Sequence, residues 1–558
     1  MLSSRTFGSV VVLLAAAAVL EPTGAQSSDG VVIDTPLGSL GGLRYRSRLG
    51  CRALLLERVY YAESPDRFQR PAAKRPWRGV LDTRGAHGGC SQNDLPDFAS
   101  GRMRTDSDAE CLTLHKPYPL VVYYPGGGWI VGAAGDYDTD TLCETFVNKG
   151  VVVVLAQHRM GTFGFFSMGT SDLPGNMAVW DAIEALKFLK VLAPSLGADP
   201  ANIILSGHGA GSFMATAVSL SPLADGLYSK LLNIGMAMAP SQMEAAEAYD
   251  RKMMQIAIAS RCANENLWRD KRRFASQIVD CMRRLSDADL VLATTPVVLR
   301  EGDMGQFWHP VVDGPAGVWP VSIEELARRR PNVPVLTGAT KDAYAYYLIA
   351  TVTDVCEKVI LETRYGRETS SARRDCDRRF RSLARPVSME HGNWPWLRRA
   401  LQAGSGAMIW EPTAQNARWY LDNGNNEVYM YSLNYRRQQD HPWWKAAGAF
   451  ESLELAFVLN WPADDPARNP WWFDIRSGRD AQMREVISET LTSFAKTGRP
   501  TLPQPYNRNT TWYPMFGNGR NVMSLDVPPR MEIDTFYEDD VAFWREMSER
   551  ASNSRVAG

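Results

Sequence analysis

Short apolar segments alternate with a segment of helical periodicity in the first half of the chain. Leu120–Tyr124, Val151–Ala156 and Asn202–Ser206 are short and rich in apolar and β-branched residues, which predicts buried strands. Strands that alternate with helices are typical of α/β proteins, so we expect a large, mostly parallel central sheet flanked by helices. One such helix is predicted over 178–192, where four apolar residues recur at helical spacing: Val179, Ile183, Leu186 and Leu189.

A glycine-rich turn follows the third predicted strand. Positions 207–211 read Gly-His-Gly-Ala-Gly. This spacing resembles the sharp strand-to-helix turn of α/β hydrolases, G-x-S-x-G, in which a nucleophilic serine stands at the tip. The tip residue here is Gly209, which has no side chain. The pattern predicts the α/β-hydrolase fold without its nucleophile.

The amino terminus has the pattern of a secretion signal. Arg5 precedes an apolar run from Val10 to Leu20, and small residues at 23–25 offer a cleavage site after Ala25. We therefore expect a signal peptide over 1–25 and a single domain over 26–558. A short membrane anchor is the alternative reading of the same run. With no later stretch of about twenty apolar residues and a polar carboxyl terminus, we predict a secreted, extracellular protein without a transmembrane anchor.

Composition and charge narrow the classes of partner. The net charge of −1 gives no overall field toward nucleic acid, and we expect none as a partner. The eight cysteines lack metal-binding spacings, so in a secreted chain they predict disulfides and no metal site. Asn509 begins a glycosylation sequon, Asn-Thr-Thr. Cysteines that are neighbours in sequence suggest three disulfides: Cys90–Cys111, Cys262–Cys281 and Cys356–Cys376. The pairing of Cys51 and Cys143 stays open.

Ordered motifs across nearly the whole mature chain resemble the cholinesterase-like, or type-B carboxylesterase, family. The match runs from about Val31 to Val541. It includes an opening hairpin, the family's "YAEPP…RF" stretch, its first disulfide loop and its "HGGGF/W" oxyanion loop. These correspond here to 31–38, 61–68, Cys90 with Cys111, and Pro125-Gly-Gly-Gly-Trp129. Further motifs follow in family order at 159–164, 174–176, 308–314 and 494–498.

The resemblance implies that all three catalytic positions have changed. Ester hydrolysis by this family uses a serine, a carboxylate and a histidine. The serine position is Gly209. The family's acid in G-x-T-x-D-E-G falls on Ala343, and its histidine in G-x-x-H-x-x-E-L falls on Glu451. The chain is therefore predicted not to be an enzyme.

Nearby polar residues are weak substitutes for the missing groups. Ser206 lies three positions before the tip, His208 points to one side, and Asp342 matches a structural aspartate of the family pattern. His441 reads as a loop residue. A vestigial oxyanion hole remains, because its backbone donors survive changes of side chain. Its members would be Gly127, Gly128 and Ala210, although Pro125 replaces the family histidine just before them.

The family includes non-catalytic adhesion and matrix proteins such as neuroligins, neurotactin, gliotactin and glutactin. We therefore expect a secreted, catalytically inactive protein that binds an extracellular protein partner and needs no cofactor. Homodimerisation through helices near 474–496 and 539–549 is a further expectation from the resemblance. The arginine-rich segment 364–385 reads as a solvated helical face or as a docking patch for an acidic partner or glycosaminoglycan.

Two other functions stay open. One is a carboxylic-ester hydrolase with unorthodox or residual catalysis. The other is a small-molecule carrier that uses the former active-site gorge, near which four tryptophans are candidates: Trp129, Trp410, Trp443 and Trp444. Core packing is the ordinary role of such tryptophans.

Overall fold

We describe the fold from a computed structural model. It describes residues 9–15, 30–47, 50–63, 67–84, 118–130, 132–170, 173–239, 246–300, 307–344, 401–436, 448–459, 478–517 and 519–556.

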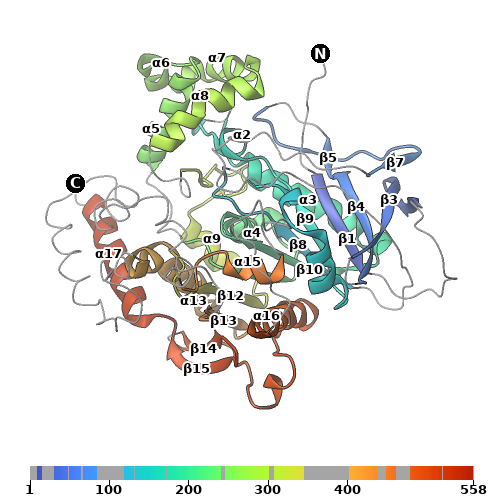
Figure 1. Cartoon of the computed structure of the whole chain (residues 1–558). Coiled ribbons are helices and arrows are strands. Elements are labelled where there is room, and N and C mark those ends of the chain that lie inside the picture. Colours follow the sequence, from blue (N-terminus) through green and yellow to red (C-terminus); the bar gives the residue numbers. More distant parts are fainter. Residues whose placement is uncertain are drawn as a thin grey trace.

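One large twisted sheet forms the core, with helices packed around it (Figure 1). Its strand order is β15-β14-β13-β12-β11-β10-β8-β9-β1-β4-β3-β2, with β7 beside β3. Neighbouring strands from β14 through β9 run parallel. At the two ends of the sheet the pairing is antiparallel, except that β7 runs parallel to β3. The expected mostly parallel sheet with flanking helices is confirmed.

The predicted elements correspond closely to the observed ones. The three predicted strands are β8 (Tyr118–Tyr124), β9 (Val152–Ala156) and β10 (Ala198–His208), and the predicted helix is α3 (Met177–Leu192). The remaining sheet strands are β1 (Ser9–Ala15), β2 (Gly30–Thr35), β3 (Gly38–Arg46), β4 (Arg52–Tyr60), β7 (Val80–Asp82), β11 (Lys230–Ile234), β12 (Val335–Thr340), β13 (Val428–Leu433), β14 (Arg520–Leu525) and β15 (Arg530–Thr535).

Strand order determines where a site can form. The chain passes from β8 to β9 on one side and then returns to β10 on the other side of β8. Ligands of open α/β sheets bind where the strand order reverses, beyond the carboxyl ends of the strands. The glycine loop after β8 and the glycine turn after β10 both lie at this switch point.

Strand β1 occupies an unexpected place. It lies between β9 and β4 and pairs antiparallel with both. These residues belong to the predicted signal peptide, whose removal would leave β4 and β9 without this neighbour. Cleavage after Ala25 stays a prediction.

A disulfide connects the amino-terminal strands to the parallel part of the fold. Cys51, beside β4, is bonded to Cys143 at the start of the short helix η2 (Cys143–Val147). Glu144 adds to this contact by accepting hydrogen bonds from the Ser47 hydroxyl and the Cys51 backbone N–H. The two cysteines whose pairing the sequence left open thus pair with each other.

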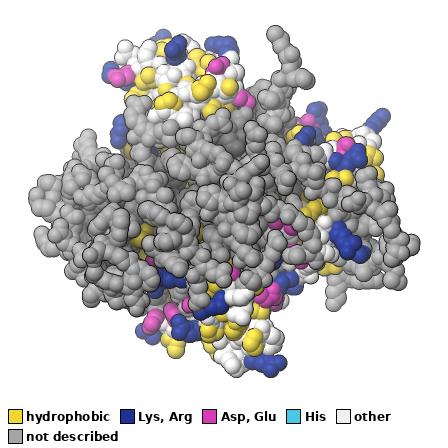
Figure 2. Space-filling model, in the orientation of Figure 1, with side chains coloured by type: hydrophobic (Ala, Val, Ile, Leu, Met, Phe, Trp, Pro, Cys, Tyr) yellow, Lys and Arg dark blue, Asp and Glu magenta, His cyan; other side chains and the backbone are white. Residues whose placement is uncertain are grey.

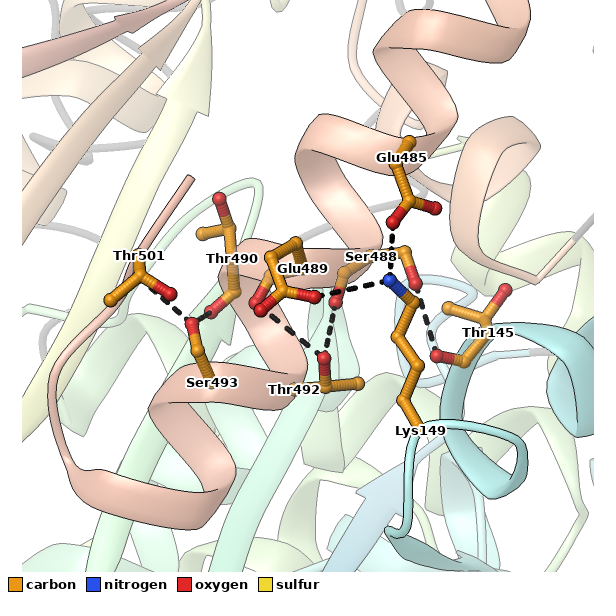
Figure 3. A network of polar contacts seen from close by, with 9 residues as sticks. All are labelled: Thr145, Lys149, Glu485, Ser488, Glu489, Thr490, Thr492, Ser493 and Thr501. Atoms are coloured by element: carbon orange, nitrogen blue, oxygen red, sulfur yellow. Dashed lines mark hydrogen bonds and ion pairs between the residues drawn. The ribbon is translucent and has the colours of Figure 1, made fainter. Parts of the chain in front are cut away.

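Polar contacts attach the long helix α16 (Gly478–Thr497) to η2 and the turn after it (Figure 3). The Lys149 ammonium lies 2.6 Å from a Glu485 carboxylate oxygen and 3.1 Å from one of Glu489. The Ser488 hydroxyl donates to the Thr145 carbonyl at 3.0 Å. The expected carboxyl-terminal helices are α16 and α17 (Glu538–Val556), while their role in dimerisation stays a prediction.

Four helices form a lobe that stands out from the body of the molecule (Figure 1). We call α5 (Ala246–Ala259), α6 (Glu265–Arg269), α7 (Lys271–Arg284) and α8 (Asp287–Arg300) the helical lobe. The expected disulfide Cys262–Cys281 is present and joins the segment after α5 to α7.

The remaining sequence predictions concern glycosylation, membrane spans, metal binding, and segments outside the described residues. Asn509 is exposed, as a glycosylated residue must be, and its modification stays a prediction. No helix among the described residues is long and apolar enough to cross a membrane. The same residues contain no cluster of His, Cys, Asp or Glu suited to a metal ion. Cys90–Cys111, Cys356–Cys376 and the arginine-rich segment 364–385 fall outside the described residues.

We expect the two disulfides to differ in their effect on stability. Cys51–Cys143 closes a loop of sequence separation 92, and Cys262–Cys281 one of 19. Chain entropy alone gives about 5 and about 3 kcal/mol respectively. Urea unfolding should therefore show a larger loss for the double variant C51A/C143A than for the matched C262A/C281A. Equal losses, or the reverse order, would contradict this account.

Candidate functional site at the glycine turn

The glycine turn keeps the shape that a nucleophile would need. Gly209 lies between β10 and α4 (Ala210–Leu220) with φ 56° and ψ −124°. Side chains rarely adopt this conformation, and a non-glycine residue held in such a region costs on the order of 1–3 kcal/mol. Glycine adopts it with little strain. The turn therefore retains its geometry while carrying no side chain at its tip.

The two outer glycines hold the turn against the neighbouring strand. A Cβ at Gly211 would lie 1.9 Å from the Tyr124 carbonyl oxygen at the end of β8. A Cβ at Gly207 would lie 2.2 Å from the Gly211 carbonyl carbon. Neither position accepts a larger residue without backbone movement, so close packing alone requires both glycines.

The loop after β8 lies against this turn. A Cβ at Gly126 would lie 2.7 Å from the His208 carbonyl oxygen, and the Gly126 N–H donates to the Tyr137 hydroxyl at 3.2 Å. Gly127 and Gly128 follow with φ of 118° and 64°. Two of the candidate oxyanion-hole residues thus lie in a loop that contacts the turn, and the third, Ala210, begins α4.

The three positions that the resemblance assigns to the catalytic triad meet at this point. A Cβ built on Gly209 would lie 3.3 Å from Glu451 Oε1, with no other non-neighbouring atom within 4 Å. The Glu451 backbone N–H donates to the Ala343 carbonyl at 3.2 Å. The structure therefore places a carboxyl group beside the empty tip, where the resemblance would place a histidine.

Asp342 is engaged in holding the segment that carries Glu451. Its Oδ2 accepts a hydrogen bond from the Ala449 N–H at 2.9 Å and lies 3.4 Å from Arg436 Nη2. A Cβ at Gly448 would lie 2.1 Å from the same oxygen. These contacts fit a structural aspartate rather than a substitute acid. His441 lies outside the described residues.

His208 is closer to the site than its position in the sequence suggested. Its Nε2 lies 3.6 Å from Glu451 Oε1, longer than a hydrogen bond, and its side chain is 3 % exposed. Burial lowers the pKa of His208 to about 3. The imidazole is therefore neutral at physiological pH and forms no ion pair with Glu451.

Two buried carboxyl groups occupy one turn at the start of α15 (Leu453–Val458). Burial raises the pKa of Glu451 to about 7, against a smaller lowering by the hydrogen bond from the Ser452 hydroxyl at 3.1 Å. Burial, then the charge of Glu451, raises the pKa of Glu454 to about 8. Tyr431 links Glu454 to the backbone by donating to Oε1 at 3.4 Å while accepting from the Gly235 N–H at 3.0 Å.

Glu454 stands at the glutamate of the family pattern G-x-x-H-x-x-E-L, which gave it no role at the site, and no motif identified Tyr431. A signal for the first existed, because Glu454 interrupts the apolar segment Leu-Glu-Leu-Ala-Phe-Val. Tyr431 had no comparable signal, since a tyrosine within a buried strand is ordinary.

The arrangement lacks one component of ester hydrolysis. Glu451, with a pKa near neutrality, is suited to accept a proton. The tip presents no hydroxyl or thiol from which a proton would be taken. Ser206 is buried within β10, and the Ser452 hydroxyl donates to Glu451 and is not within 4 Å of a Cβ built on Gly209. Proton acceptance is available here, but nucleophilic attack by residue 209 is not.

The described tryptophans serve packing. Trp129 is 1 % exposed and packs edge-on against Phe165, while Trp410 stacks on Tyr537 with ring centroids 3.8 Å apart. Its indole N–H donates to the Thr340 carbonyl. Trp443 and Trp444 lie outside the described residues.

The raised pKa of Glu451 predicts a pH-dependent stability. Between the ordinary value of 4.5 and about 7, the unfolded chain releases this proton while the folded chain keeps it. The contribution to stability is therefore present at low pH and is lost as pH rises through about 7. We expect Glu451→Gln to raise Tm relative to wild type by several degrees at pH 8 and by much less at pH 5.

Thermal unfolding at both pH values measures this difference. The exposed Glu324→Gln serves as the matched control and should show no such pH-dependent gain. Because both variants keep His208, its own titration cancels in the comparison. A constant Tm difference between pH 5 and pH 8 would contradict the assignment.

Comparison with known proteins agrees with this geometry. Residues 29–544 match the Carboxylesterase family. Among similar proteins, gut esterase 1 of Caenorhabditis briggsae is 27 % identical, over 93 % of each chain. Carboxylesterase 3 of Homo sapiens is 25 % identical over 86 % of this chain and 84 % of its own, and an acetylcholinesterase of Leptinotarsa decemlineata is 23 % identical over 92 % and 86 %. With the sheet, the switch point and the glycine turn in place, this chain belongs to the carboxylesterase family and has its α/β-hydrolase fold.

Proposed function

We propose that this chain is a secreted, non-hydrolysing member of the carboxylesterase family that acts by binding an extracellular protein partner, in adhesion, matrix contact or signalling. The observation that carries the proposal is the turn at Gly209. It has the conformation of a nucleophile turn, no side chain at its tip, and the Glu451 carboxyl group beside it.

The magnitude of the catalytic deficit supports this proposal. In serine hydrolases, loss of the serine or the histidine alone lowers turnover about a millionfold, and further losses add little. Both positions are occupied here by other residues. The similar proteins carry esterase names, which describe those proteins. Backbone donors at Gly127, Gly128 and Ala210 would leave at most a residual rate.

The packing around the turn supports a scaffold kept for its shape. Gly207 and Gly211 are required by contacts with β8 and with each other, independently of any chemistry. Trp129 and Trp410 are used for core packing, so these two tryptophans give no support to a small-molecule carrier. A fold whose shape is maintained by packing can serve as a scaffold for surface contacts with another protein.

Activity-based labelling tests the loss of catalysis. We expect no labelling of wild type by a fluorophosphonate probe and no turnover of short-chain esters, with an active carboxylesterase labelled in parallel. We also expect no ester turnover by Gly209→Ser, because a serine beside Glu451 lacks the histidine that would return the proton to the alcohol leaving group. Restored turnover in the triple variant G209S/A343E/E451H would show that the three positions form one unit.

Labelling of wild type would overturn the proposal. Loss of that labelling in Ser452→Ala, but not in Ser206→Ala, would then identify an unorthodox nucleophile. Rapid ester hydrolysis by Gly209→Ser alone would show that Glu451 and Ala343 do not limit activity.

Secretion and partner binding are tested on the protein from culture medium. We expect mass spectrometry to find an amino terminus at Gln26 and a glycan on Asn509. A chain that begins upstream of Ser9 would contradict cleavage and would keep β1 in the sheet. Extracellular proximity labelling should enrich a cell-surface or matrix protein, and the same enrichment by G209S would show that binding does not depend on the tip residue.

A further inference from the structure

The helical lobe concentrates positive charge in a chain that is nearly neutral. Residues 261–284 contain seven arginines and lysines against three carboxylates, whereas the whole chain has a net charge of −1. Dark blue side chains mark the outer edge of the lobe where it rises above the body in Figure 2. A local excess of this kind attracts anions even where the overall field does not.

The periodicity of α7 places the unpaired arginines on its outer face. Apolar residues face inward: Ala275, Ile278, Val279 and Met282 are buried. Arg272, Arg273 and Arg284 are exposed and lie within about a third of the helix circumference at 100° per residue. Arg261 is also exposed and adjoins this face, because the Cys262–Cys281 disulfide brings it against the second half of α7.

Several other charged residues of the lobe form ion pairs within it. Lys271 pairs with Asp250, and Arg269 lies 3.5 Å from Glu265. Asp280 is the one carboxylate on the outer face of α7, and it lies 3.4 Å from Arg283 Nη1. The three outward arginines of α7 and Arg261, beside the disulfide, form no ion pair with any described residue. They are therefore available to an external anion.

The shape of this cationic stripe favours a linear polyanion. Arg273 and Arg284 are eleven residues apart, or about 16 Å along the helix axis. Guanidinium groups bind sulfate and phosphate through paired hydrogen bonds, which suits arginine better than lysine. The helix offers no apolar face for insertion into a membrane, because those residues are packed inside the lobe.

We propose that the outer face of α7, with Arg261, Arg272, Arg273 and Arg284, is a docking site for a sulfated glycosaminoglycan chain. This inference rests on the secretion proposed above but not on the loss of catalysis. It differs from the segment 364–385 considered from the sequence, since it uses only residues of the helical lobe.

Heparin binding by the purified full chain tests the site. We expect wild type to bind heparin at 150 mM salt and to lose most binding when the heparin is desulfated. The triple variant R272A/R273A/R284A should bind heparin at least roughly tenfold more weakly than wild type, and its affinity should depend less steeply on salt concentration. The matched control R508A/R520A/R530A removes three exposed arginines outside the lobe and should bind like wild type. Arg508 ends the short helix η8 (Tyr506–Arg508), and Arg520 and Arg530 begin β14 and β15, which lie far from the lobe in Figure 1.

The opposing outcomes are distinct from failure of the proposed function. No heparin binding by wild type, or equal loss in both triple variants, would overturn the site. Equally tight, arginine-dependent binding of double-stranded DNA would overturn its assignment to a sulfated sugar. Probe labelling measures catalysis separately, so either proposal can fail alone.

Discussion

The contact between the glycine turn and the end of β8 is the constraint on which the site depends. Gly207, Gly211 and the Tyr124 carbonyl approach so closely that no side chain fits between them. That contact determines where α4 begins, where the Gly209 backbone lies at the tip of the turn, and where the loop of Gly127 and Gly128 lies. Backbone packing, rather than any catalytic side chain, maintains the shape of an esterase active site in this protein.

Electrostatics at the turn now favour uncharged groups. Burial lowers the pKa of His208 to about 3 and raises the pKa of Glu451 to about 7 and that of Glu454 to about 8. Near neutral pH the His208 imidazole is then neutral, the Glu454 carboxyl group is mostly protonated, and the Glu451 carboxyl group is protonated in about half of the molecules. An active triad works differently, because its histidine becomes charged during the reaction and a carboxylate stabilises that charge. The charge states at this turn therefore differ from those that an active triad uses.

Much of the fold could be predicted from the sequence, because its strands are buried on both faces and read as continuous apolar runs. The degenerate positions could be located because motif spacing fixes Gly209 and the segment ending in Glu454-Leu455. Contacts between residues distant in the sequence were harder to predict. The spacing predicted that His208 points to one side of the tip but not that it lies beside Glu451, since the direction of a side chain at a strained turn does not follow from spacing. Likewise, the sequence left Cys51 and Cys143 unassigned because 92 residues separate them.

The Glu451 carboxyl group affects whether a side chain at position 209 can be accommodated. Its oxygen lies 3.3 Å from the place where a side chain at Gly209 would begin. A returning serine would meet backbone strain and a crowded oxygen at once, while gaining nothing until Ala343 and Glu451 also changed. Under the proposed loss of catalysis, a serine restored at position 209 alone would therefore lower the stability of the turn without restoring ester hydrolysis.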